Sequence, residues 1–201
     1  MTRPESSDAG ERADAAAELR KLADGLVLPR TVALVGLMGA GKTTIGRRLA
    51  SALRLPFVDA DHEIERAADQ TVAEIFAIHG EAEFRRGERR VIARLLEDPP
   101  HVLATGGGAF IDPRTRALMK ERAISIWLKA PLDVLMRRVA RRDDRPLLKE
   151  DDPQAVMQKL MDERYPIYAE ANLTVESANS PHNAAVAEII AALRAYLGQG
   201  T

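Results

Sequence analysis

The chain has 201 residues, 46% hydrophobic and 29% charged, which is typical of one globular domain with a substantial core. Its 29 Lys and Arg residues nearly balance its 30 Asp and Glu residues, so charge gives no reason to expect a nucleic-acid partner. Cysteine is absent, which excludes disulfides and thiol chemistry, and no apolar run approaches the roughly 18 residues that span a membrane, so we expect a cytoplasmic protein without a membrane partner.

Residues 1–29 are predicted to form an N-terminal extension that precedes the folded domain. Residues 1–10 are polar and contain Pro, Ser and Gly, so we expect this segment to be disordered. Residues 11–26 are rich in alanine, with leucines at helical spacing, which favours a short amphipathic helix as much as a loosely ordered leader. Pro29 ends the segment, and the domain is predicted to occupy residues 30–201.

A glycine-rich loop, residues 36–43 with the sequence GLMGAGKT, joins a predicted strand at 31–35 to a predicted helix at 44–53. It fits the pattern G-x-x-x-x-G-K-[ST], in which backbone N–H groups and a helix N-terminus surround the phosphates of a nucleotide. Lys42 is expected to reach the β and γ phosphates of ATP, and the Thr43 hydroxyl to bind Mg²⁺. The predicted ATP-binding residues of the loop are Gly39, Ala40, Gly41, Lys42, Thr43 and Thr44.

Further strands are predicted downstream, at residues 56–58, 102–104, 124–128 and 173–175. Helices are predicted from about residue 61, from a capping box at Thr71 and Glu74, and over 81–96, 112–122, 131–139, 153–169 and 180–197. Because strands alternate with helices, we expect a parallel sheet covered on both faces, which is a three-layer α/β/α domain.

Chemistry-bearing residues follow the ends of the predicted strands. Asp59 and Asp61 follow the second strand, where an extended backbone would put them on one face. They can hold Mg²⁺ or meet substrate hydroxyls, although such a pair also serves as a helix cap. Residues 106–108, three glycines, follow the third strand and form either a close approach for a ligand or a flexible connection. Because the carboxyl ends of parallel strands share one edge, we expect these groups to converge.

Arginines are the distinctive charged residues of the second half of the chain. Most are expected to be solvated, but a kinase for an anionic small molecule needs arginine to fork a carboxylate and to meet charge on the transferred phosphoryl group. Arg145 begins the sequence RPLL in a highly charged segment, and we predict a lid over about residues 141–153. The four histidines show no metal-binding spacing.

Six motifs in order, GLMGAGKTT, FVDADHEIE, GEAEFRRGE, VLATGGGA, RPLL and ERYPIYAE, resemble the shikimate kinase family over about residues 30–197. This family belongs to the nucleoside-monophosphate-kinase-like branch of phosphate-loop kinases. The resemblance implies a five-stranded parallel sheet of order 2-3-1-4-5 with a mobile lid. It also implies that the chain transfers phosphate from ATP to the 3-hydroxyl of shikimate, a step of aromatic amino acid biosynthesis. We expect the chain to be a monomer.

On the nucleotide side, the resemblance implies that Lys42 and Arg145 contact ATP phosphates. Thr43 and Asp59 would serve Mg²⁺, the latter through water. Arg138 and Pro181 match the positions that sandwich adenine.

On the substrate side, the resemblance implies that Asp61 receives substrate hydroxyls and is the candidate base. Arg85 and Arg164 would clamp the carboxylate, with Glu88 bracing Arg85. Gly107 and Gly108 would present backbone N–H groups to the substrate.

Two alternatives remain open at the level of sequence. A related small-molecule kinase, such as one for gluconate, would share the loop and fold, although the paired arginines and RPLL favour a ring acid. A non-catalytic, shikimate-kinase-like sensor would be expected to lose catalytic positions, and Lys42, Thr43, Asp59, Asp61 and Arg145 are all present.

Overall fold

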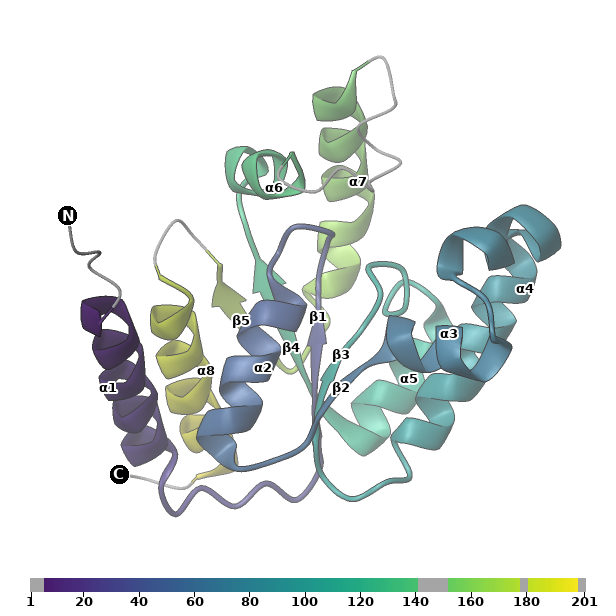
Figure 1. Cartoon of the computed structure of the whole chain (residues 1–201). Helices are drawn as coiled ribbons and strands as arrows, with labels where there is room; N and C mark the ends of the chain where they lie inside the picture. Colours follow the sequence, from purple (N-terminus) through teal and green to yellow (C-terminus); the bar gives the residue numbers. More distant parts are fainter. Residues whose placement is uncertain (1–5, 141–151, 178–180, 199–201) are drawn as a thin grey trace.

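The structure, a computed structural model, describes residues 6–140, 152–177 and 181–198. A five-stranded sheet with only parallel pairings lies at the centre, in the order β2-β3-β1-β4-β5 (Figure 1). The strands are β1 (Thr31–Val35), β2 (Phe57–Asp59), β3 (Val102–Ala104), β4 (Ala123–Lys129) and β5 (Leu173–Glu176). The predicted α/β class and strand order are confirmed.

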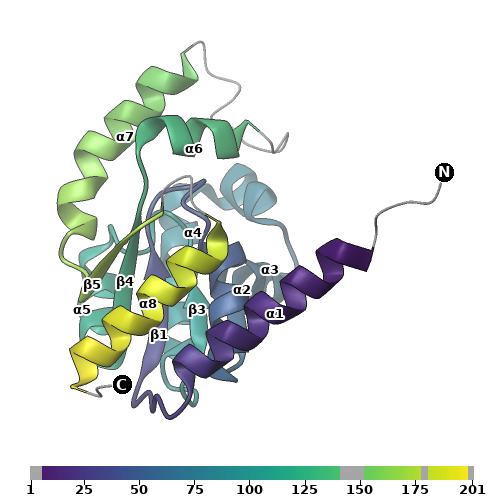
Figure 2. The same cartoon turned by 90° about the vertical axis from the view of Figure 1, so that its left-hand side faces the viewer.

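Helices cover both faces of the sheet. Their bounds are α1 (Ser6–Ala23), α2 (Lys42–Leu53), α3 (Ala60–Ala68), α4 (Val72–Leu95), α5 (Pro113–Arg122), α6 (Leu132–Val139), α7 (Pro153–Tyr168) and α8 (His182–Leu197). Helices α2 and α8 lie on one side with α1 packed on both, whereas α5 and the end of α7 lie on the other (Figure 2). Among the described helices, none combines the length and the apolar character needed to cross a membrane.

The sheet is buried because both of its faces carry helices. Every residue of β1 and the first six residues of β4 are buried. Such unbroken apolar strands are expected in a parallel sheet, where no face meets water. Phe110 and Tyr168 are among the largest fully buried side chains, and their rings lie 6.5 Å apart.

The register of the strands aligns their carboxyl ends. Leu34 of β1 pairs with Ala104 of β3, and Ala104 pairs with Asp59 of β2. The Thr105 amide donates to the Leu34 carbonyl at 3.2 Å, which continues the ladder by one residue, and the Thr105 hydroxyl donates to the same carbonyl at 2.9 Å. The loops that leave these three strands therefore begin at the same edge of the sheet.

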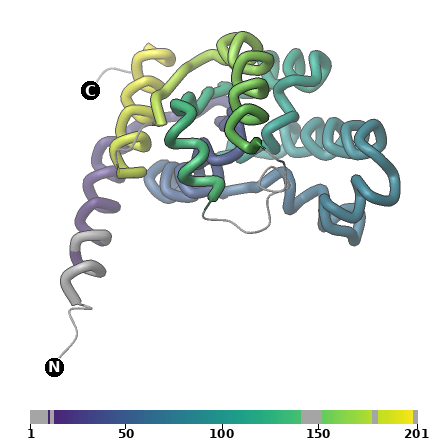
Figure 3. Tube along the Cα trace, turned by 90° about the horizontal axis from the view of Figure 1, so that it is seen from above, coloured from purple at the N-terminus to yellow at the C-terminus, as the bar shows by residue number. Residues whose placement is uncertain are grey.

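Helix α1 and the pair α3 and α4 lie at opposite ends of the molecule, as Figures 1 and 3 show. At one end, α1 packs Leu19 and Ala23 against α2 and α8, and Ser6–Gly10, expected to be disordered, are the first residues of this helix. At the other end, α3 and α4 enclose a small cluster of Ile64, Ile75 and Phe84. The division of the chain at residue 30 stays a prediction.

The cap of α4 confirms a local prediction from the sequence. The Thr71 hydroxyl accepts from the Glu74 amide at 3.2 Å, and the Glu74 carboxylate accepts from the Thr71 amide at 2.8 Å. Gly80 interrupts the helix with φ of 76°, a left-handed value that glycine adopts readily.

Candidate active site

The loop between β1 and α2 curls around the side chain of its own lysine. Gly41 has φ of 93° at the N-cap of α2, and a Cβ at Gly36 would lie 2.8 Å from the Leu128 carbonyl, so both positions require glycine. The Lys42 ammonium donates to the carbonyls of Gly36 at 2.8 Å and Leu37 at 3.0 Å. The ammonium and the start of α2 give this loop a positive interior suited to phosphate.

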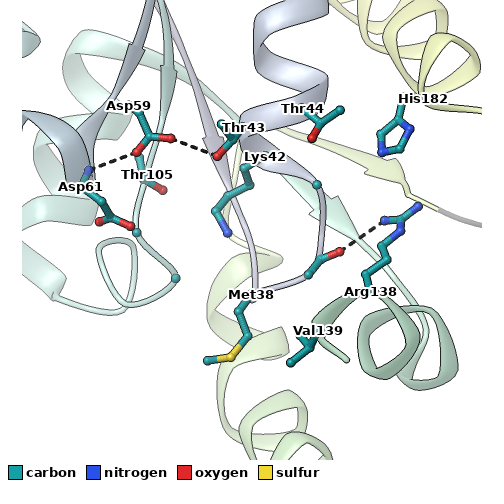
Figure 4. Close-up of a pocket in the computed structure, with 14 residues that line it drawn as sticks. Met38, Lys42, Thr43, Thr44, Asp59, Asp61, Thr105, Arg138, Val139 and His182 are labelled. Atoms are coloured by element: carbon teal, nitrogen blue, oxygen red, sulfur yellow. Dashed lines mark hydrogen bonds between the residues drawn. The ribbon is translucent and has the colours of Figure 1, made fainter. Parts of the chain in front are cut away.

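Two oxygen groups meet beside the loop. The Thr43 hydroxyl donates to Asp59 Oδ2 at 2.9 Å, and Asp59 Oδ1 accepts from the Asp61 amide at 3.2 Å (Figure 4). Asp59 ends β2 and is the N-cap of α3, so Asp61 lies in the first helical turn rather than on an extended strand as expected. The cap and the functional interpretation of Asp59 therefore coexist.

A cavity of about 340 Å³ lies between the strand ends. The residues that line it are Met38, Gly39, Gly41, Lys42, Thr43, Thr44, Asp59, Asp61, Thr105, Gly106, Gly107, Arg138, Val139 and His182. Nine of the site residues predicted from the sequence are in this set: Gly39, Gly41, Lys42, Thr43, Thr44, Asp59, Asp61, Gly107 and Arg138. Phosphate-binding and carboxylate groups thus share one hollow, with the triple glycine forming part of its wall.

Arg85 lies against the triple glycine and is not among the residues that line the cavity. A Cβ on Gly108 would lie 2.5 Å from the Arg85 guanidinium nitrogens, so the loop and the cation are in direct contact. Arg85 Nη1 donates to Glu88 Oε2 at 2.7 Å, and the Glu88 side chain is only 2% exposed. Glu88 therefore fixes the Arg85 guanidinium beside the loop, as the resemblance implied.

The charges of this pair depend on each other. Burial opposes the charged form of Arg85, but the Glu88 and Glu81 carboxylates outweigh it and raise the pKa of the guanidinium. Burial also raises the pKa of Glu88, an effect that Arg85 opposes and the Asp61 charge reinforces. Repulsion between the Asp61 and Glu88 carboxylates thus links this pair electrostatically with the cavity.

Arg164 approaches the same loop from α7. Its side chain acts electrostatically on the buried hydroxyl of Tyr168, which lies one helical turn later, and that hydroxyl donates to the Gly107 carbonyl. The positive charge of Arg85 also acts on the Tyr168 hydroxyl. The two arginines therefore converge on the triple glycine, although neither is in the lining of the 340 Å³ cavity.

The other end of the cavity is held by Arg138 of α6. Its Nη1 donates to Ser177 Oγ at 2.9 Å and to the Gly39 and Ala40 carbonyls at 3.4 Å. The Ser177 hydroxyl in turn donates to the Ala40 carbonyl at 2.8 Å. This network fixes the tip of the phosphate loop to α6 and to the end of β5.

The start of α8 borders the same end. Pro181 is the N-cap of α8, and the next residue, His182, lines the cavity. Burial and the charges of Arg48 and Arg138 lower the pKa of His182, which favours its neutral ring. Arg145 and most of the predicted lid lie outside the described residues, so its expected contact with ATP stays a prediction.

Sequence reasoning missed several groups of the site. Thr105, Ser177 and His182 follow or precede predicted elements at the relevant edge, a position that could have marked them. Tyr168 lies four residues after Arg164, so helical periodicity could have put the two on one face. Its hydroxyl had no motif to identify it.

These features define a class of protein. A phosphate loop after the first strand, strand order 2-3-1-4-5 and a cavity that joins this loop to Asp59 and Asp61 are the parts of a phosphate-loop kinase for a small molecule.

Comparisons with known proteins make the class specific. The family model described as shikimate kinase matches residues 38–194. The chain is 58% identical over 165 residues to the shikimate kinase of Caulobacter vibrioides, covering 82% of each protein. A solved shikimate kinase from Acinetobacter baumannii in complex with shikimate is 38% identical, with a TM-score of 0.77, covering 89% of this chain and 97% of that one. The chain belongs to the shikimate kinase family.

A more distant likeness addresses the fold alone. A gluconokinase from Sinorhizobium meliloti is 17% identical, with a TM-score of 0.59, and covers 83% of this chain and 93% of its own. This identity shows a common fold and gives no support to gluconate as substrate.

Proposed function

We propose that this enzyme transfers the γ-phosphoryl group of ATP to the 3-hydroxyl of shikimate, giving ADP and 3-phosphoshikimate. The observation that carries the proposal is the convergence of Arg85 and Arg164 on the triple-glycine loop, beside a cavity that contains Lys42 and Asp61. Family membership supports the same reaction, because the relatives named above are shikimate kinases.

The nucleotide side uses the phosphate loop. Backbone N–H groups of residues 39–44 and the N-terminus of α2 hold the β and γ phosphates, and Lys42 offsets charge on the transferred group. Arg138 and Pro181 would enclose the adenine, with the base near His182. The proposal for Arg138 is supported by its anchoring to the phosphate loop through Gly39, Ala40 and Ser177.

The site suits Mg²⁺ as cofactor. The Thr43 hydroxyl and the Asp59 carboxylate lie within 2.9 Å of each other beside the loop, and Mg²⁺ is typically held by one or two such oxygens together with phosphates and water. The described residues contain no cluster of three or more His, Asp or Glu suited to a metal, which fits an ion that arrives with its nucleotide. When bound, Mg²⁺ neutralises charge on the β and γ phosphates.

The acid side uses the two guanidinium groups. Arg85 and Arg164 hold the ring carboxylate, because planar forks pair well with carboxylates. Their anchoring to Glu88 and Tyr168 fixes this end of the ring. The ring then spans from the triple glycine toward Asp61, whose carboxylate accepts a hydrogen bond from the attacking hydroxyl.

Catalysis follows mainly from position and charge. Asp61 takes the hydroxyl proton or orients that hydroxyl toward the γ phosphorus, and a loose transition state demands little of a base. Arg145 is proposed to close over the phosphates with the lid and exclude water.

The test is ADP release by the purified protein with ATP, Mg²⁺ and shikimate, compared with quinate and gluconate. Of the three acids, we expect only shikimate to give fast ADP release. Fast turnover with gluconate and none with shikimate would support the alternative kinase, and absence of turnover with all three acids would support the sensor. Arg85→Ala and Arg164→Ala should each raise the KM for shikimate strongly, since loss of a buried charge contact costs about 2–5 kcal/mol.

The remaining expectations, a monomer acting in the cytoplasm, are also part of the proposal. Large exposed hydrophobic side chains of the described residues are Leu22, Val27, Phe76, Ile78 and Tyr196. Phe76 and Ile78 belong to α4 and Leu22 to α1, at opposite ends of the molecule, so these two groups lie on separate surfaces. Light scattering coupled to size-exclusion chromatography measures the oligomeric state directly.

A further inference from the structure

Tyr168, the fully buried last residue of α7, lies beside Arg164 and the triple-glycine loop, where we propose that the ring carboxylate binds. Its hydroxyl donates to the Gly107 carbonyl and lies near enough to Arg164, one turn earlier on α7, for the guanidinium to act on it. A phenol has one donor proton and accepts through its lone pairs. Because the Tyr168 proton goes to the Gly107 carbonyl, the lone pairs of the Tyr168 oxygen are available to accept from the Arg164 guanidinium.

Holding the Gly107 carbonyl also orients the next amide. The carbonyl of Gly107 and the N–H of Gly108 belong to one planar trans peptide unit and point in opposite directions. A hydroxyl that fixes the carbonyl on one side thus fixes the direction of the Gly108 N–H on the other. Two backbone hydrogen bonds stabilise the rest of the loop. The Ala109 amide donates to the Gly106 carbonyl at 3.2 Å, and the Ile111 amide donates to the Gly108 carbonyl at 3.0 Å.

Arg85, the second arginine proposed to bind the carboxylate, lies against the same peptide unit. The Arg85 guanidinium lies directly against Gly108, close enough that a Cβ there would lie 2.5 Å from it. A rotation of the peptide between Gly107 and Gly108 would therefore disturb Arg85 as well as Arg164. Burial raises the pKa of the Tyr168 hydroxyl to about 12, so it remains a donor at any working pH.

We propose that Tyr168 is a positioning residue for the acceptor acid: its hydroxyl joins Arg164 to the triple-glycine loop and sets both guanidinium groups and the Gly108 N–H for the carboxylate. It touches no reacting atom and acts through its neighbours. The inference rests on the proposed function, because it assumes a carboxylate held by these two arginines.

The test uses Tyr168→Phe, which removes one oxygen and keeps the ring that packs near Phe110 and Trp127. Tyr165→Phe is the matched control, because the Tyr165 hydroxyl also leaves α7 to donate to a backbone carbonyl, that of Ala130, which is not part of the acid site. Calorimetry measures the Kd for shikimate in the full-length chain, and steady-state assays measure KM for shikimate, its methyl ester and ATP. Thermal unfolding of all variants reports stability.

We expect Tyr168→Phe to raise the Kd and KM for shikimate about 5- to 10-fold, the scale of a lost positioned hydrogen bond, and to leave the KM for ATP within about twofold. With the methyl ester, which has no charged carboxylate, the difference from wild type should fall below about twofold. Tyr165→Phe should leave unchanged the Kd for shikimate and the KM values for shikimate, its methyl ester and ATP.

Equal Kd values for shikimate in Tyr168→Phe and wild type would overturn the proposal. So would parallel losses in both Phe variants, or equal rises in the KM for ATP and shikimate, because either result indicates a general structural role. A wild-type enzyme that neither binds nor phosphorylates shikimate would overturn the proposed function itself, an outcome distinct from an active wild type matched by Tyr168→Phe.

Discussion

The glycines of the loop at residues 106–108 differ in what a side chain would meet. A Cβ at Gly107 would have its nearest neighbours at 3.7 Å, an ordinary contact, whereas at Gly108 it would lie 2.5 Å from the Arg85 guanidinium. The obstacle is the end of a flexible side chain, so Gly108→Ala should fold and displace Arg85. We expect the KM for shikimate to rise by about tenfold or more, with the KM for ATP unchanged.

Gly87→Ala is the control for that variant, since it adds the same methyl group two residues after Arg85 on α4, where a Cβ would meet nothing within 4 Å. Steady-state assays of both variants with shikimate and ATP make the comparison. If Gly87→Ala raised the KM for shikimate as much as Gly108→Ala, direct contact between the loop and Arg85 would not be the cause.

Asp61 is the other residue whose role can be isolated. Asp61→Asn keeps the shape and removes the charge that would accept the hydroxyl proton, so kcat should fall about 100-fold or more while ATP binding is retained. Asp69→Asn, at the exposed end of the same helix, is the control for charge, because asparagine tolerates its left-handed φ of 52°. Turnover close to wild type in Asp61→Asn would remove Asp61 from the mechanism.

How much of the site could be predicted depends on the kind of contact. Lys42, Thr43 and Asp59 are close because a local loop and one strand pairing bring them together, and both are visible as patterns in the sequence. The contact of Tyr168 with Gly107 joins groups 61 positions apart, which only the packing of α7 determines. Local patterns therefore predict the nucleotide half better than the anchoring of the acid half.

At the scale of helices and strands, local capping signals predicted the starts of elements well. The Thr71 box and the Asp112-Pro113 pair begin α4 and α5 as expected. Asp61 was expected on an extended backbone, but Asp59 caps α3 and turns the chain into a helix one residue later. For α1, Ser6–Gly10 contain no apolar residue besides Ala9, so no hydrophobic pattern indicates that the helix begins there.

The cap of α5 gives a prediction about stability. Asp112 accepts from the amides of Arg114 at 3.0 Å and Thr115 at 2.8 Å, and from Arg89 at 2.9 Å. Burial opposes ionisation, but these donors outweigh it and lower the pKa of Asp112 below its ordinary 3.8. Asp112→Ala should lower the free energy of unfolding by about 1–2 kcal/mol at neutral pH.

The sign of the pH dependence follows from that lowered pKa. The folded state binds the Asp112 proton less readily than the unfolded chain does, so the stabilisation is present above pH 3.8 and is lost as pH falls through the lower folded value. The difference between wild type and Asp112→Ala in urea unfolding should therefore shrink on acidification below that pH. Asp98→Ala, at an exposed position outside the helices, should have the same free energy of unfolding as wild type both at neutral pH and below pH 3.8.

For the whole molecule, the two halves of the proposed site lie side by side at the carboxyl edge of the sheet. The phosphate loop belongs to β1 and α2, which pack toward α8 and α1, whereas Arg85 belongs to α4 at the opposite end (Figures 1 and 3). The triple glycine after β3 lies between them and contacts both. Stability at the α1 end should consequently be separable from recognition of the acid.

Leu19→Ala tests that separation. Leu19 is 6% exposed against α2 and α8, so removing its side chain should cost about 2–3 kcal/mol and lower the melting temperature by about 5–10 °C. Both KM values should stay unchanged at temperatures where the protein is folded, because α1 packs on the outer faces of these helices and lies outside the family match at residues 38–194.

Leu22→Ala provides the matched control, since Leu22 lies on the same helix but is 46% exposed. The same truncation there should leave the melting temperature within about 1 °C of wild type, as expected for a surface position. Thermal unfolding and steady-state kinetics at one temperature, well below both transitions, complete the measurement. A rise in the KM for ATP in folded Leu19→Ala would mean that α1 does more than stabilise the domain, because the disturbance would have travelled along α2 to the phosphate loop at its N-terminus.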